Sequence, residues 1–271
     1  MRTTTALLGT GALFAATAGL ALPASAQEDT AAVFILHGIP DSALGGDATV
    51  DVYVDGEEAV PNFTPGTLTP QIDLPAGSYD VAISPNDAGL EGAVLEAELT
   101  VEAGMNYTAV AYLSADGTPS VKPFVNNTEA AGAGQGKLTA RHIAQAPEVT
   151  VFVDGGEVAS VANPNEISAP LPAGEYDVEL QAGGAAVPTT PSTDAVPVQD
   201  GVNTIAYAWG TADDLQIAVQ TVNLGHSAPS GVPGGESGLA AATNAGWLYA
   251  AAAAGIVGIA VAGRRLATSE K

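Results

Sequence analysis

Cysteine is absent from all 271 residues of the sequence. Its absence excludes a disulfide framework and thiol-based catalysis, and it is compatible with export from a bacterium. The fold must therefore be held together by its apolar core.

Basic residues are scarce. Seven lysine and arginine residues stand against 30 aspartate and glutamate residues, which gives a net charge of −23. Between residues 27 and 226 the imbalance is larger, because 28 acidic residues and only Lys122, Lys137 and Arg141 give a net charge of −25. Such a surface repels nucleic acid and anionic lipid headgroups, so we expect neither as a partner; it attracts cations and keeps the chain soluble.

The motifs of common catalytic sites are also missing. No G-x-S-x-G sequence marks a serine nucleophile, no glycine-rich phosphate loop opens a helix after a strand, and no D-x-D-x-D-G loop marks an EF-hand. Paired carboxylates for glycoside hydrolysis are an alternative in so acidic a chain, but they require a cleft. We therefore expect a protein that is not an enzyme and that carries no cofactor.

The first 26 residues have the features of a secretory signal. Arg2 precedes an apolar stretch, and the small residues Ala24-Ser25-Ala26 precede polar Gln27. The alternative is an N-terminal membrane anchor, for which the apolar stretch is short. We expect residues 1–26 to be removed on export.

A second apolar segment lies near the other end of the chain. Residues 239–263 carry no charge and are long enough to cross a bilayer. Trp247 and Tyr249 suit the headgroup level, and Arg264-Arg265 place the tail, residues 264–271, in the cytoplasm by the positive-inside rule. A buried alanine-rich helix is the alternative. We expect an ectodomain that is anchored in the plasma membrane and exposed outside the cell.

Residues 225–238 are rich in Gly, Ser and Pro and suit a flexible stalk. The order of stalk, apolar helix and Arg-Arg resembles the sorting signal of Gram-positive cell-wall proteins. However, Val232-Pro233-Gly234-Gly235-Glu236 lacks the threonine of that motif. A retained membrane anchor is therefore preferred to covalent attachment to the wall.

Three sequence blocks occur twice in the same order. Val50 to Gly56 matches Val149 to Gly155, Leu74 to Val81 matches Leu171 to Val178, and Gly104 to Tyr112 matches Gly201 to Trp209. Three ordered matches indicate a duplicated domain. We expect a first repeat at residues 27–127, a linker at 128–136 and a second repeat at 137–224.

Alternation of apolar and polar residues predicts β-strands within each block. Val50, Val52 and Val54 face one side, whereas Asp51 and Tyr53 face the other. Turn signals every 8 to 12 residues, with no sustained helical period, favour an all-β fold of two tandem immunoglobulin-like β-sandwich domains.

The repeated phrase LPAG-x-YDV predicts a turn that each repeat uses once. Leu74 ends one short strand, and Pro75-Ala76-Gly77 reverses the chain as a hairpin corner. Tyr79, Val81 and Ile83 then face the core in the next strand, as do Tyr176, Val178 and Leu180 in the second copy.

These residues also carry a family resemblance. His37-Gly38-Ile39-Pro40-Asp41, VDVYVDG and LPAGSYDV resemble the bacterial secreted family catalogued as domain of unknown function 4397, whose members have a His-Ala-Ser-Pro-Asp-like stretch and the same strand and turn. The resemblance covers most of residues 31–127 and, more weakly, 137–224. It implies two tandem copies of a surface domain and brings no known catalytic residues.

His37 and His142 occupy equivalent positions at the end of the first predicted strand of each repeat. One hypothesis makes them metal ligands, together with Asp41 and Glu148, since imidazole and carboxylate suit zinc. The alternative is an imidazole that bonds the loop backbone and fixes the end of the strand. With one histidine in each repeat, the second is preferred and no metal is expected.

Acidic and aromatic residues suggest two further kinds of ligand site. Asp55, Glu57 and Glu58 beside the first Asp-Gly turn are candidates for a calcium site, although weak cation association is preferred. The aromatic residues at equivalent positions of the two repeats are candidates for a carbohydrate platform, or else cover the other sheet or the domain junction. These ligand-binding candidates are Tyr53, Phe152, Tyr112 and Trp209.

The sequence thus favours a non-enzymatic cell-surface protein of the bacterial envelope, in which an acidic two-domain module stands on a membrane-anchored stalk. The alternative is a binding module for a cell-wall glycan, Ca2+ or an envelope protein.

Overall fold

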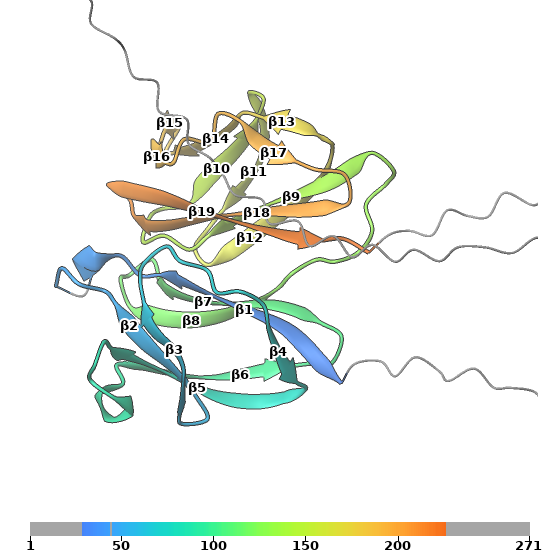
Figure 1. Cartoon of the computed structure of the whole chain (residues 1–271). Helices are drawn as coiled ribbons and strands as arrows, with labels where there is room; N and C mark the ends of the chain where they lie inside the picture. Colours follow the sequence, from blue (N-terminus) through green and yellow to red (C-terminus); the bar gives the residue numbers. More distant parts are fainter. Residues whose placement is uncertain (1–28, 44, 226–271) are drawn as a thin grey trace, which may run out of the picture. The chain divides into compact units, whose positions relative to one another are not determined.

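The computed structural model describes residues 29–43 and 45–225, which form two β-sandwiches (Figure 1). The first sandwich has one sheet in the order β4-β1-β7-β8 and a second in the order β3-β2-β5-β6. The strands are β1 (Thr30–Gly38), β2 (Val50–Val54), β3 (Glu57–Phe63), β4 (Ile72–Pro75), β5 (Gly77–Pro85), β6 (Leu95–Val101), β7 (Asn106–Leu113) and β8 (Pro119–Val125). Two short 3-10 helices, η1 (Asp41–Ala43) and η2 (Leu90–Gly92), lie in its loops.

The second sandwich repeats this plan. Its sheets have the orders β12-β9-β18-β19-β16 and β11-β10-β14-β15, and β13 pairs with β17. The strands are β9 (Gln135–His142), β10 (Val149–Val153), β11 (Gly156–Val161), β12 (Asn165–Pro172), β13 (Gly174–Tyr176), β14 (Val178–Ala182), β15 (Ala185–Ala186), β16 (Thr189–Thr190), β17 (Val196–Val198), β18 (Val202–Thr211) and β19 (Asp214–Asn223). The all-β prediction is confirmed for the described residues.

The strand order differs from the immunoglobulin order, so the immunoglobulin-like part of the prediction is not confirmed. In both sandwiches the first strand runs parallel to a late strand, β1 to β7 and β9 to β18. The second and third strands, β2 and β3, are neighbours in one sheet, whereas in immunoglobulin domains they lie in opposite sheets. The reason is the two-residue Asp-Gly turn, which allows only a return along the same sheet.

That turn has the predicted conformation in both copies. Asp55 and Gly56 have φ angles of 51° and 83°, and Asp154 and Gly155 have φ angles of 50° and 75°. Positive φ at both central residues is what the right-handed twist of a two-residue hairpin requires, and Asp-Gly tolerates it well.

The LPAG turn is not the hairpin corner that the sequence predicted. Leu74 lies in β4, which pairs with β1, whereas Tyr79 lies in β5, which pairs with β2 and β6. Pro75-Ala76-Gly77 therefore carries the chain from one sheet to the other. Alternation alone does not say which sheet receives the next strand, so the two kinds of corner look the same in sequence.

Each sandwich encloses its own core. The first includes Val33, Val50, Val52, Val81, Ile83, Leu99 and Val101, and the second includes Leu138, Val151, Val161, Val178, Leu180, Val198 and Ile217. The inward positions predicted from alternation, among them Val81 and Val178, are confirmed.

Several predictions fall outside the described residues. These are the signal at residues 1–26, most of the stalk at 225–238, the membrane helix at 239–263 and the tail at 264–271. Among the described residues, no helix has the length and apolar character needed to cross a membrane.

Candidate functional site

The surface where the two sandwiches meet is the candidate functional site, and we call it the joint. Sheet β4-β1-β7-β8 packs on sheet β12-β9-β18-β19 through a third apolar core. Its buried members are Leu36, Val110, Tyr112, Phe124, Ile143, Ile205, Tyr207 and Val222. Residues 107–113 of β7 are all buried, because one face of the strand lies in the first core and the other in the joint.

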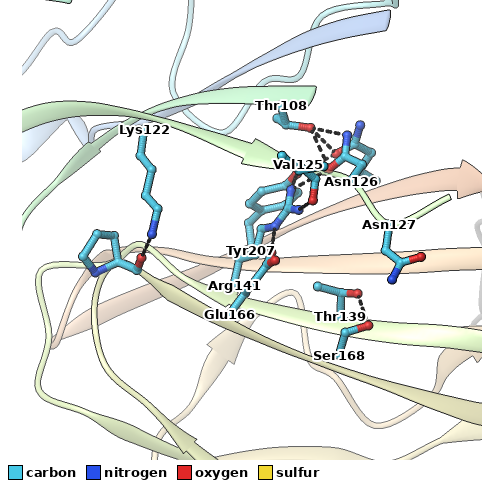
Figure 2. A network of polar contacts seen from close by, with 12 residues as sticks. Thr108, Lys122, Val125, Asn126, Asn127, Thr139, Arg141, Glu166, Ser168 and Tyr207 are labelled. Carbon is cyan, nitrogen blue, oxygen red and sulfur yellow. Dashed lines mark hydrogen bonds and ion pairs between the residues drawn. The ribbon is translucent and has the colours of Figure 1, made fainter. Parts of the chain in front are cut away.

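Arg141 on β9 is the largest polar side chain in the joint and is 1% exposed. Its Nε donates to Glu166 Oε2 on β12 at 2.5 Å, the single salt bridge among the described residues. Its Nη1 donates to Asn126 Oδ1 at 2.8 Å, and its Nη2 donates to the Val125 carbonyl at 3.3 Å (Figure 2). The guanidinium of the second sandwich thus holds the end of the first.

Aromatic rings enclose the same guanidinium. Its central carbon lies 4.5 Å from the centre of the Phe124 ring and 5.2 Å from that of Tyr207. Cation–π attraction is strengthened where water is excluded, as it is here. Arg141 therefore connects the sandwiches through cation–π contacts of its guanidinium as well as through its hydrogen bonds.

A chain of hydroxyl and amide groups extends from Arg141 into the first sandwich. Arg141 Nη1 donates to Tyr207 Oη at 2.6 Å, and Tyr207 Oη donates to Gln220 Oε1 at 2.6 Å. Thr108 on β7 donates to the same Gln220 oxygen at 2.9 Å. Burial raises the pKa of Tyr207 above its usual value, although the charge of Arg141 acts in the opposite direction. The phenol stays protonated and serves as both donor and acceptor.

The two described lysines also bond across this region. Lys122 on β8 donates to the Pro164 carbonyl of the second sandwich, and its ammonium lies 4.7 Å from the centre of the Phe124 ring. Lys137 on β9 donates to Asn127 Oδ1 at 2.6 Å and to the Glu129 carbonyl at 3.0 Å. Arg141 and Lys122 therefore connect the two sandwiches, whereas Lys137 ties β9 to the end of the first sandwich and to the linker at an exposed position.

The distribution of basic residues along the sequence is a signal for the joint. The only basic residues between 27 and 226 fall within residues 122–141, on both sides of the predicted linker. In a chain this acidic, such grouping indicates that the cations have partners there.

His37 has the backbone-bonding role that was the preferred alternative to metal binding. It is fully buried; its Nδ1 accepts the Ile39 N–H at 3.3 Å, so its Nε2 carries the proton and donates to the Ala48 carbonyl at 2.6 Å. Asp41 caps the same loop by accepting the Ala48 N–H at 2.9 Å. Burial lowers the pKa of His37, despite the opposing effects of Ala48 and Asp41.

His142 has the equivalent role in the second sandwich. Its Nε2 lies 2.9 Å from the Pro147 carbonyl, which, like Ala48, stands two residues before the next strand. Burial again lowers the histidine pKa, and Nδ1 has no hydrogen-bond partner among the described residues. Glu148 is exposed. Within the described residues, no cluster of three or more His, Asp or Glu side chains is placed to hold a metal.

The calcium candidates do not converge. Asp55 Oδ1 accepts the Asp80 N–H at 2.9 Å, and the Asp55 N–H donates to the Asp80 carbonyl at 2.8 Å. Glu57 and Glu58 are exposed at the start of β3. The Asp55 carboxylate thus braces the turn against β5.

Two of the aromatic ligand candidates are buried, which contradicts their prediction as an exposed platform. Tyr53 is 8% exposed and Tyr112 is 7% exposed. Tyr112 belongs to the third core, as the alternative reading of a domain junction requires. Tyr53 lies on β2 beside Asp51, which is buried because its carboxylate accepts the N–H groups of Asn62 and Asp87 at 2.9 and 3.0 Å.

The other two aromatic candidates are partly buried. Trp209 packs against the third core, and its ring lies over Gly66, where an added Cβ would come within 2.5 Å of Trp209 Cζ2. Phe152 lies on β10 between Glu157 and Glu179 of the neighbouring strands. The structure brings Tyr112 and Trp209 to the joint and leaves Tyr53 and Phe152 on separate sheets.

A comparison with curated proteins found no match to this chain. Among family models, the one described as Domain of unknown function (DUF4397) matches residues 31–151, in one copy. The matched region contains the first sandwich, the linker, β9 and most of β10, and so it includes Arg141. Residues 31–151 are therefore similar to this family.

Proposed function

We propose that the protein is a non-enzymatic component of the bacterial envelope that holds a stiff, acidic two-sandwich module outside the cell. In this proposal residues 1–26 direct export, 239–263 anchor the chain in the plasma membrane, and 225–238 form the stalk. The tail at 264–271 stays in the cytoplasm.

The observation that carries this proposal is the joint. Two domains connected by a linker alone move relative to one another, whereas here a third core, the buried Arg141 and the bridging Lys122 connect them. Because Arg141 is buried and Lys122 bonds across the joint, the exterior of the described residues carries far more carboxylates than cations. Mechanical stiffness and a uniformly negative exterior are what a spacer at an anionic cell surface needs, because like charge keeps the module extended and unaggregated.

We also propose that the second sandwich is a second copy of the same domain. The strand order β4-β1-β7-β8 has its counterpart in β12-β9-β18-β19, with a parallel pair at the same place. The Asp-Gly turn, the LPAG corner and the buried histidine also recur. Duplication explains all four similarities with one event.

Binding to an envelope protein is the second candidate function, and the exposed edge strand β6 favours it. Cell-wall glycan and Ca2+ have weaker support, because two of the aromatic candidates are buried and the other two are partly buried, and because the acidic candidates do not converge.

A distance measurement in the full chain tests the stiffness. The chain has no cysteine, so Glu57→Cys and Glu175→Cys, both at exposed positions, give one spin label on each sandwich. We expect a single narrow distance distribution. A broad distribution would overturn the stiff-spacer proposal. Arg141→Ala in the same background serves as the control, since weakening the joint must broaden the distribution.

A protease experiment tests the location. Protease added to intact cells should remove the ectodomain, while an epitope at the C-terminus remains protected with the membrane. Protection of the ectodomain in intact cells would contradict the proposed orientation.

A further inference from the structure

The outer face of sheet β3-β2-β5-β6 contains a hollow of about 510 Å³. Its lining includes Gly56, Asp80, Ala82, Leu90, Glu96 and Glu98. Strands β5 and β6 form its floor, and the first residue of η2 forms part of its wall. This face lies on the side of the first sandwich away from the joint.

The strand beside the hollow has a free edge. Among the described residues, β6 pairs with β5 and with no other strand. An edge strand presents unpaired backbone N–H and C=O groups to which another strand can add. The segment that leads into β6 also exposes two of the larger apolar side chains, Leu90 at 41% and Val94 at 59%.

The charges on this face are unbalanced. Asp80 and Glu98 stand directly opposite one another across β5 and β6, an arrangement that destabilises a sheet. Neither they nor Glu96 belongs to a salt bridge within the described residues. The exposed carboxylates therefore make this face complementary to a positively charged ligand.

The geometry of β6 determines which side-chain pattern a strand added beside it must have. Side chains alternate between the two faces of a strand, so Glu96 and Glu98 project on one face of β6 while Leu95 and Leu99 project on the other. A strand added beside β6 would meet carboxylates with every second side chain and apolar groups with the rest. A second copy of β6 fails this requirement, because it would place glutamate opposite glutamate.

We propose that β6 and the adjoining hollow are a docking surface for an extended, cationic segment of a partner protein, in which lysine or arginine alternates with apolar residues. The segment adds to the sheet as a further strand. Its basic side chains lie over Asp80, Glu96 and Glu98, and its backbone bonds the free edge of β6. This docking would add a binding activity to the spacer function and does not depend on it.

The probe is a seven-residue peptide of alternating lysine and valine, which matches the length of β6. It is titrated into the full chain at physiological salt, and amide hydrogen exchange is followed in parallel. We expect saturable binding, slowed exchange of the β6 amides, and no binding of the matching glutamate–valine peptide.

Paired variants separate docking from general attraction to an acidic protein. Glu96→Gln with Glu98→Gln should weaken binding about tenfold, as expected for two exposed ion pairs. Glu157→Gln with Glu175→Gln removes the same charge from exposed positions of the second sandwich and should leave binding nearly unchanged.

Three results would overturn the proposal: no saturable binding to the native chain, equal weakening in both double variants, or binding without protection of the β6 amides. The exchange measurement on the native chain keeps the test decisive even where a variant folds poorly.

Discussion

The Tyr79 hydroxyl donates a hydrogen bond to the carbonyl oxygen of Pro75 at 2.7 Å, four residues earlier in the chain. Tyr176 does the same to Pro172 at 2.8 Å in the second sandwich. Each tyrosine thereby fixes the corner at which the chain passes between sheets. The repeated phrase LPAG-x-YDV thus records one structural device that occurs twice.

The aspartate of the LPAG-x-YDV sequence, Asp80 or Asp177, links this corner to the Asp-Gly turn. The Asp80 N–H donates to Asp55 Oδ1, and the Asp177 N–H donates to Asp154 Oδ1 at 3.0 Å. The corner and the Asp-Gly turn are therefore linked in both copies, which explains why the two motifs recur together.

Removing the tyrosine hydroxyls tests this account. Tyr79→Phe and Tyr176→Phe should each lower the free energy of unfolding by about 1 kcal/mol, the usual worth of one hydrogen bond. Because the two corners lie in different sandwiches and share no hydrogen-bond partner, the double variant should show the sum of both losses. Denaturant unfolding monitored by circular dichroism gives these values. Equal stability of all three variants and the native chain would contradict the role of the hydroxyls.

The local parts of this fold were predictable from the sequence. Val50, Val52 and Val54 alternate with polar residues, and Asp55-Gly56 specifies its turn, because both signals depend on neighbouring residues only. The LPAG corner was placed correctly but given the wrong partner sheet, since pairing is decided by distant strands.

The joint was missed for a related reason. Residues 107–113 are apolar on both faces, which a central strand of one sandwich explains as well as a strand between two cores does. Tyr112 and Trp209 were candidates either for a carbohydrate platform or for the domain junction, and the sequence did not decide between the two. They occupy equivalent positions because the same face of each repeat packs against the other.

Arg141 is expected to be the most sensitive polar residue of the joint. Arg141→Ala leaves the Val125 carbonyl without its side-chain donor and leaves Asn126 Oδ1 with only the longer bond from Thr108 at 3.3 Å. It also removes the stacking on Phe124, so the free energy of unfolding should fall by about 3 kcal/mol. Lys137→Ala, which removes an exposed ammonium, should cost about 0.5 kcal/mol. Denaturant unfolding compares the two; equal losses would show that the buried network contributes no more than a surface contact.

The two buried histidines predict a loss of stability in weak acid. Burial lowers the folded-state pKa of His37 and His142 below the ordinary value of 6.5. In acid the unfolded chain takes up protons first, so stability is complete above about pH 6.5 and falls as the pH drops from 6.5 toward the folded pKa values. The melting temperature should therefore decline between pH 7 and pH 5.

A matched variant assigns that decline to the histidines. His37→Gln keeps a side-chain N–H near the Ala48 carbonyl but does not titrate, so it should flatten part of the pH dependence even where it lowers the melting temperature at pH 7. Nuclear magnetic resonance titration of the imidazoles gives the pKa values directly. A pKa of 6.5 or above for His37 or His142 in the folded chain would contradict the prediction.

Salt should stabilise the described region, because its carboxylates face one another without intervening cations. Residues 27–226 carry a net charge of −25, and of their three basic side chains Arg141 and Lys122 are engaged at the joint. Added salt screens repulsion between exposed charges over distances near the Debye length, about 8 Å at physiological ionic strength, and so favours the compact state. The melting temperature should rise from low salt to 1 M KCl. This rise should be smaller in a variant in which Glu96, Glu98, Glu157 and Glu175 are replaced by glutamine. Arg141→Ala should keep at least the full salt dependence, since it removes a cation and leaves the Glu166 carboxylate, which is 37% exposed, without its partner. A melting temperature that falls with salt would mean that the joint's ion pair, rather than repulsion at the surface, dominates the electrostatics of folding.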